Sequence, residues 1–106
     1  MNESAFRLGP HSLRKRDGRV VPFDIFRLQR ALNAAGDQTG EFGSAMAWLL
    51  AQQIVVYLSD REALDAESVQ DMMEEQLMEA FYFRTARACI LYRERRREAG
   101  PQDHAA

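Results

Sequence analysis

The chain has 106 residues, of which 46% are hydrophobic and 28% are charged. This length suits a single domain with one core and excludes a second. The single cysteine, Cys89, excludes a disulfide framework and a cysteine-based zinc site. No apolar run is long enough to span a membrane and the N-terminus lacks a signal-peptide pattern, so a cytoplasmic location is expected.

Charge is distributed unevenly along the chain, although the formal net charge is only −2. Between Arg7 and Arg30 there are seven basic residues and two acidic ones, and between Arg84 and Arg97 there are six arginines and one glutamate. The middle of the chain, residues 31–83, has one arginine and ten acidic residues. If the fold brings the two basic ends together, they form one focused positive site.

The first predicted element is a β-hairpin, preceded by a flexible arm over residues 1–11. Asp17-Gly18 is a strong signal for a two-residue hairpin loop because both loop positions need positive φ. With this loop, Lys15 pairs with Val20 and Leu13 with Pro22, and these four side chains share one face. Pro22 cannot donate a ladder hydrogen bond, so the second strand should be short or lie at an edge.

Four helices are predicted after the hairpin. The first begins after the N-cap Asp24 and stops at Gly36. The second, residues 44–58, is apolar on nearly all sides and should be the central, most buried helix. A polar connection over residues 59–64 leads to a third helix capped by Asp65.

The fourth helix is predicted over residues 82–97, with Phe83, Ala86 and Ile90 facing inward. Residues 99–106 are expected to be a flexible tail, which leaves residues 12–98 as the folded domain. The predicted fold class is therefore α+β, mainly α, with an N-terminal β-hairpin over a four-helix bundle.

Motifs for catalysis or metal binding are missing from the sequence. No GxxxxGK[ST] or GxGxxG loop occurs, and the two histidines, His11 and His104, lie in the predicted flexible ends. Glu74, Glu75 and Glu79 have no second carboxylate or histidine cluster to work with, so a solvated face is expected for them. The sequence indicates a regulatory or binding domain, with no catalytic residues and no metal site.

Two segments resemble a known family. Residues 15–18 read KRDG, residues 22–24 read PFD, and Arg27 follows three positions after Asp24. Near the other end, residues 86–96 read ARACILYRERR, which is similar to the pattern A-x-A-Y-I-x-Y-R-x-x-R. Together, at this separation, they resemble the ATP-cone domain of ribonucleotide reductases, most closely the N-terminal cone of the anaerobic enzymes.

The resemblance implies an allosteric domain that binds ATP or dATP with Mg²⁺ between the hairpin, the first helix and the end of the last helix. Lys15, Arg16 and Arg95 would hold phosphates. Leu13 would pack on the base, and Asp24 and Arg27 would hydrogen-bond the adenine or ribose. The implied partners are a ribonucleotide reductase catalytic domain or subunit and further copies of the chain in a nucleotide-dependent oligomer.

Val21 and Ala66 depart from the family pattern, because relatives can have polar nucleotide contacts at these positions. Two other classes of function remain open. A nucleic-acid-binding module, or a nucleotide-responsive transcriptional regulator, would use the arginines, although aromatic interleaving and a helix-turn-helix signature are missing. A helical protein-interaction module would use the arginines only as a solvated surface.

Overall fold

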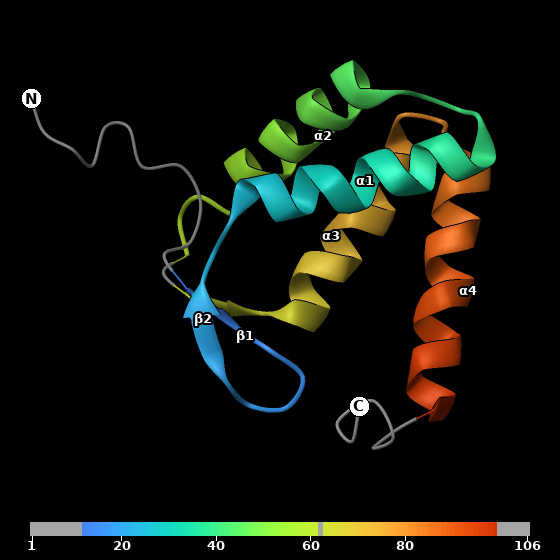
Figure 1. Ribbon diagram of the computed structural model, residues 1–106. Helices are drawn as coiled ribbons and strands as arrows, with labels where there is room; N and C mark the ends of the chain where they lie inside the picture. Colours follow the sequence, from blue (N-terminus) through green and yellow to red (C-terminus); the bar gives the residue numbers. More distant parts are fainter. Residues whose placement is uncertain (1–11, 62, 100–106) are drawn as a thin grey trace, which may run out of the picture.

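The computed structural model describes residues 12–61 and 63–99, and the predicted arm and nearly all of the predicted tail lie outside this part of the chain. Within it, a small sheet lies beside four helices (Figure 1). The elements in chain order are β1 (Ser12–Arg14), β2 (Val20–Pro22), α1 (Ile25–Thr39), α2 (Ser44–Tyr57), β3 (Ala63–Asp65), α3 (Ala66–Glu79) and α4 (Phe83–Ala99). The predicted fold class, mainly helical with an N-terminal hairpin, is confirmed.

The hairpin differs from the prediction by one residue in register. Leu13 pairs with Val21, and the N–H of Lys15 donates to the carbonyl of Arg19 at 2.7 Å. The loop between them has three residues and ends at Gly18, whose φ is 95° and whose N–H donates to the Lys15 carbonyl. A turn followed by a left-handed glycine is the usual three-residue hairpin loop, so the predicted two-residue loop is wrong.

A third strand, β3, pairs in parallel with β1, so that the strand order is β2-β1-β3. The sequence predicts a polar connection over residues 59–64, so this strand is a difference from the prediction. Three residues are too few to show an alternating pattern, and the partner strand is distant in the sequence. Leu64 of β3 is buried beside Leu13, and β2 remains the edge strand that Pro22 predicts.

Helix α1 begins as predicted but ends later. Asp24 caps it by accepting a hydrogen bond from the Phe26 N–H at 2.9 Å. The helix continues through Gly36, the predicted stop, and ends at Thr39, with Gly40 as its C-cap at a φ of 76°. Gly36 is buried because the Phe42 ring lies directly against it, where a Cβ would collide. This glycine allows close approach and does not terminate the helix.

Helix α2 supplies much of the core but is not central. Its buried residues are Ala47, Leu50, Ala51, Ile54 and Val55. The opposite side is open, since Leu49, Val56 and Tyr57 are each more than half exposed. The helix packs on α1 and α3 at one edge of the molecule, and hydrophobic composition alone does not say which side is covered (Figure 1).

Helix α4 buries small side chains, and two of the three predicted inward residues are exposed. Phe83 and Ile90 are on the surface, while Ala86 is buried as predicted together with Thr85 and Cys89. The buried face of α4 is formed by small side chains, and it contacts α1 and α3. Burial raises the pKa of the Cys89 thiol, and the nearby Glu74 carboxylate adds to the shift, so this cysteine is a protonated core residue.

Candidate functional site

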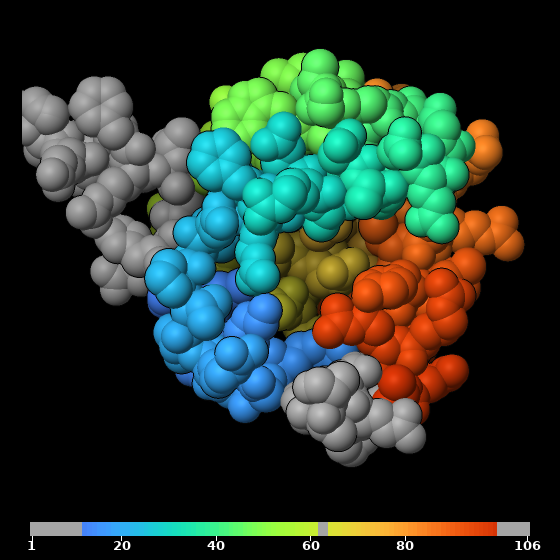
Figure 2. Space-filling view, viewed as in Figure 1, coloured from blue at the N-terminus to red at the C-terminus, as the bar shows by residue number. Residues whose placement is uncertain are grey.

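A hollow separates the hairpin from α4, with α1 above it and α3 on its floor (Figure 2). This hollow is an open cleft on the surface of the domain. It is lined by Arg16, Ala66, Glu67, Gln70, Tyr92, Arg93 and Arg96. Most of these side chains are charged or polar, so the cleft suits a polar, anionic ligand.

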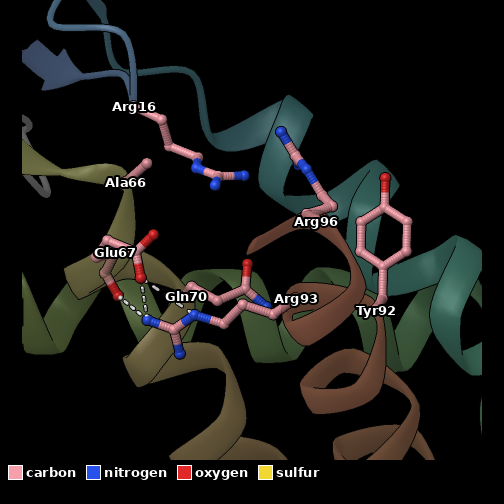
Figure 3. Close-up of a pocket in the computed structure, with 7 residues that line it drawn as sticks. All are labelled: Arg16, Ala66, Glu67, Gln70, Tyr92, Arg93 and Arg96. Atoms are coloured by element: carbon pink, nitrogen blue, oxygen red, sulfur yellow. Dashed lines mark hydrogen bonds and ion pairs between the residues drawn. The ribbon is translucent and has the colours of Figure 1, made fainter. Parts of the chain in front are cut away.

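Two arginines reach into the cleft from opposite sides. Arg16 comes from the β1–β2 loop and Arg96 from the last turns of α4, with their guanidinium groups directed toward each other (Figure 3). Arg96 also lies over the Tyr92 ring, 5.7 Å from its centroid. Guanidinium groups donate several hydrogen bonds in a fixed plane, which suits phosphate oxygens.

Arg93 lies deeper and joins α4 to α3. Its side chain is only 16% exposed and forms ion pairs with Glu67, with Asp71 at 2.8 Å and with Glu74 at 3.2 Å. Burial disfavours the charge on Arg93, but hydrogen bonds to Glu67 and Asp71 outweigh it and raise the guanidinium pKa. Glu74 is itself only 12% exposed, so the expectation that it lies on a solvated face is wrong.

Glu67 is an acidic residue inside this basic cleft, on the first turn of α3. Its carboxylate accepts hydrogen bonds from Arg93 and, at 3.4 Å, from Arg97. The hydrogen bond from Arg93 lowers the pKa of Glu67, burial opposes the shift, and the charges of Arg97 and Arg16 lower it further. The carboxylate is therefore held in its ionised form at neutral pH.

Of the six residues that the sequence predicts to bind nucleotide, the structure places some in the cleft and others outside its lining. Arg16 lines the cleft, and Lys15 precedes it, half-buried, at the end of β1. Leu13 is half-buried against the hydrophobic core. Asp24 and Arg27 are exposed at the start of α1, the helix above the hollow, and Arg95 is exposed on α4 without lining the cleft.

Sequence reasoning missed Tyr92, Arg93 and Arg96, which line the cleft from α4. Residues at i and i+4 share one face of a helix, so Tyr92 and Arg96 lie together and Arg95 lies about 100° away. The pattern Y-R-x-x-R itself matches its two arginines to positions 93 and 96. Helical spacing therefore contained the signal that favours Arg96 over Arg95.

Residues 12–61 and 63–99 contain neither a candidate metal-binding cluster nor a candidate membrane-spanning helix. No group of three or more metal-ligating side chains occurs there. Helices in the same part of the chain are too short or too polar to cross a membrane.

Comparison with known proteins gives a consistent result. The family model of the ATP cone domain matches residues 12–98. A vitamin B12-dependent ribonucleoside-diphosphate reductase of Mycobacterium tuberculosis is 36% identical over 89 residues, which are 84% of this chain and 13% of the reductase. The anaerobic ribonucleoside-triphosphate reductase of Salmonella typhimurium is 35% identical over 88 residues, 79% of this chain and 12% of that protein.

A third relative, the vitamin B12-dependent reductase of Thermoplasma acidophilum, is 35% identical over 88 residues and likewise covers 78% of this chain and 12% of its own length. The chain thus spans only about an eighth of the length of these relatives. Its described elements nevertheless fall entirely within the matched range, apart from the last residue of α4. The chain belongs to the ATP-cone family, whose members are allosteric regulatory modules.

Proposed function

We propose that this domain binds ATP or dATP in the cleft between the hairpin and α4, and that binding regulates a ribonucleotide reductase catalytic domain or subunit. The observation that carries the proposal is the approach of Arg16 and Arg96 from opposite walls of one polar cleft. A triphosphate has about four negative charges, and charge-assisted donors from two separate elements match it.

The phosphate end of the site would lie between the hairpin loop and the last turns of α4. Arg16 and Arg96 would donate to the phosphates, with Lys15 supplying a further cation from the end of β1. We assign to Arg96 the role that the sequence suggested for Arg95, because Arg96 lines the cleft. Arg19 is engaged elsewhere, in an ion pair with Asp17 at 2.8 Å.

The base and ribose would extend toward β1 and the start of α1. Leu13 would give apolar contact to the base, and Asp24 and Arg27 would provide hydrogen bonds. One Asp24 oxygen already accepts from the Phe26 N–H. A carboxylate has about four acceptor positions, so capping the helix is compatible with accepting from the adenine amino group. Ala66 on the cleft wall supplies no polar contact, which leaves recognition to these residues and the backbone.

Mg²⁺ would accompany the triphosphate. The described residues lack a cluster of metal ligands, and Mg²⁺ commonly keeps waters and binds mainly through substrate phosphates. The protein's own contribution would be the arginines that neutralise the remaining phosphate charge.

Regulation would require that ATP and dATP stabilise different assemblies, since a ligand with equal affinity for both shifts no equilibrium. The two nucleotides differ in one hydroxyl group. The ribose position relative to the hairpin would therefore decide which helix faces are presented to other subunits. In this scheme dATP would favour an inactive oligomer and ATP the active one, and the domain itself would perform no catalysis.

Calorimetric titration with ATP, dATP and GTP in the presence of Mg²⁺ tests the proposal. We expect both adenine nucleotides to bind and GTP to bind clearly more weakly. Duplex DNA serves as the comparison, because steeply salt-dependent DNA binding without nucleotide binding would instead indicate a nucleic-acid module. Indifference to nucleotides and DNA alike would indicate a protein-interaction module.

A further inference from the structure

Glu67 lies in the cleft close to the arginines that a bound phosphate would contact. Its carboxylate contacts Arg93 and Arg97, and the charge of Arg16 also acts on it. Arg16, Glu67 and Arg96 line one cleft, with Glu67 on its floor and the two arginines above it (Figure 3). An anion that enters the cleft therefore encounters a carboxylate already engaged with the arginines.

Like charges in one cleft repel, and they compete for the same donors. At roughly 6 Å, two unit charges interact by about 0.7 kcal/mol at the dielectric constant of water and by more in a partly shielded site. Arg93 lines the cleft, and it cannot give its full hydrogen-bonding capacity to phosphate while Glu67 occupies part of it.

We propose that Glu67 is an internal anion that competes with the nucleotide phosphates for the arginines of the cleft, so that its negative charge weakens nucleotide binding and keeps it reversible. The inference rests on the proposed function and adds a residue that sets its affinity. When nucleotide binds, the phosphates take over part of the hydrogen bonding of Arg93, and the contact between the start of α3 and the end of α4 loosens.

The other two acidic partners of Arg93 do not have this position. Asp71 pairs with Arg93 at 2.8 Å but is 61% exposed and does not line the cleft. Glu74 is almost buried beneath Arg93, also outside the cleft lining. Arg93 therefore keeps two carboxylate partners when Glu67 is neutralised, and the α3–α4 contact should survive the substitution.

Calorimetric titration tests whether Glu67 weakens phosphate binding. The wild-type chain, Glu67→Gln and Asp71→Asn are each titrated with ATP and with inorganic tripolyphosphate, with and without Mg²⁺. Asp71→Asn is the matched control, because it also removes one carboxylate partner of Arg93, but a partner that lies outside the cleft lining. We expect Glu67→Gln to bind both ligands about three- to tenfold more tightly than wild type. Asp71→Asn should stay within about twofold, as expected for a screened surface pair.

Equal affinities of Glu67→Gln and Asp71→Asn would overturn the inference. So would weaker binding by Glu67→Gln only in Mg²⁺, because that result would make Glu67 a ligand of the cation. Thermal denaturation checks the fold, and Glu67→Ala gives a second neutral variant with the same expected gain. Failure of wild type to bind ATP or dATP would refute the proposed function, whereas tripolyphosphate binding by Glu67→Gln alone would still support the competition.

Discussion

The two ends of α4 place a carboxylate in different surroundings. At its N-terminal end, the Glu41 carboxylate accepts from the Thr85 N–H at 2.7 Å, from the Thr85 hydroxyl at 2.6 Å and from the Arg84 N–H at 3.3 Å. Thr85 is fully buried, and its hydroxyl also meets that of Thr39 at 2.6 Å. At the C-terminal end, three arginines and one glutamate line an open cleft.

The difference separates a structural carboxylate from one in a binding site. Glu41 satisfies backbone donors that the start of a helix leaves without intrahelical partners, and it ties the α1–α2 loop to α4. This end has one arrangement of fixed donors. The cleft end has an excess of positive charge that an external anion can neutralise, so we expect ligand effects there and packing effects at the N-terminal end.

The largest expected effect comes from the ligand. A nucleotide bound only by the native state adds about 2.7 kcal/mol to the free energy of unfolding at a hundredfold excess over Kd. Amide hydrogen exchange should slow most in residues 12–22, because a short hairpin is only marginally stable without further contacts. Exchange that slows equally at Thr85, or leaves the hairpin unchanged, would contradict this division of the molecule.

Gly36→Ala should produce the next largest effect, at the packed end. The added Cβ would collide with the Phe42 ring, which itself packs on Tyr82 with centroids 4.7 Å apart. Overpacking of this kind costs roughly 1–3 kcal/mol, measured by chemical denaturation. Nucleotide affinity should be unchanged, since Gly36 and Phe42 are outside the cleft lining. A fully stable variant would show that the ring can move aside.

Much of the fold follows from the sequence, because helix caps and apolar stripes are local signals. Asp24 and Asp65 are confirmed as N-caps, and Leu28 and Leu32 are buried at helical spacing. Gly36 could not be interpreted locally. The same residue type ends helices and permits close packing, and only the position of Phe42 decides between them.

The sequence predicts that two basic segments form the site, but it does not predict every residue that lines the cleft. The two basic segments do converge at one cleft, where Arg16 faces Arg96. The role of Glu67 could not be foreseen, because its partner Arg93 is brought to it by the packing of α3 on α4. For the same reason the sequence could not distinguish Arg93, held by carboxylates, from the arginine that reaches into the cleft.

Phe81→Gly should stabilise the packed end by a smaller amount. Phe81 joins α3 to α4 with a φ of 66°, and its side chain is 75% exposed. The left-handed conformation costs a non-glycine residue roughly 1–2 kcal/mol, of which glycine recovers part. Phe81→Ala is the control, because it also loses the ring contact with Phe83 but keeps the strained φ. Equal melting temperatures for the two variants would argue against strain at this residue.

Glu41→Gln should have the smallest of these effects, a loss of stability that is present at neutral pH and disappears on acidification. The Thr85 hydroxyl is the main cause that lowers the pKa of Glu41 below 4.5, burial opposes it, and the Thr85 and Arg84 N–H groups lower it further. A lowered pKa gives stability that is present above the ordinary pKa and is lost as the pH falls through the folded value. Melting temperatures between pH 3 and 7 should therefore fall less steeply on acidification in Glu41→Gln than in wild type. Parallel curves would show that Glu41 contributes no linkage.

The most direct test of the cleft as a phosphate site compares two adjacent arginines of α4 by calorimetric titration with ATP. Arg96 lines the cleft and Arg95 does not, although both have the same charge and lie on the same turn of the helix. Arg96→Ala should weaken binding by roughly 1.5–3 kcal/mol, about ten- to hundredfold, the usual worth of a hydrogen bond to a charged group. Arg95→Ala should lose only a small, salt-screened part. Equal losses for both variants that disappear in high salt would show a diffuse basic surface and contradict the site.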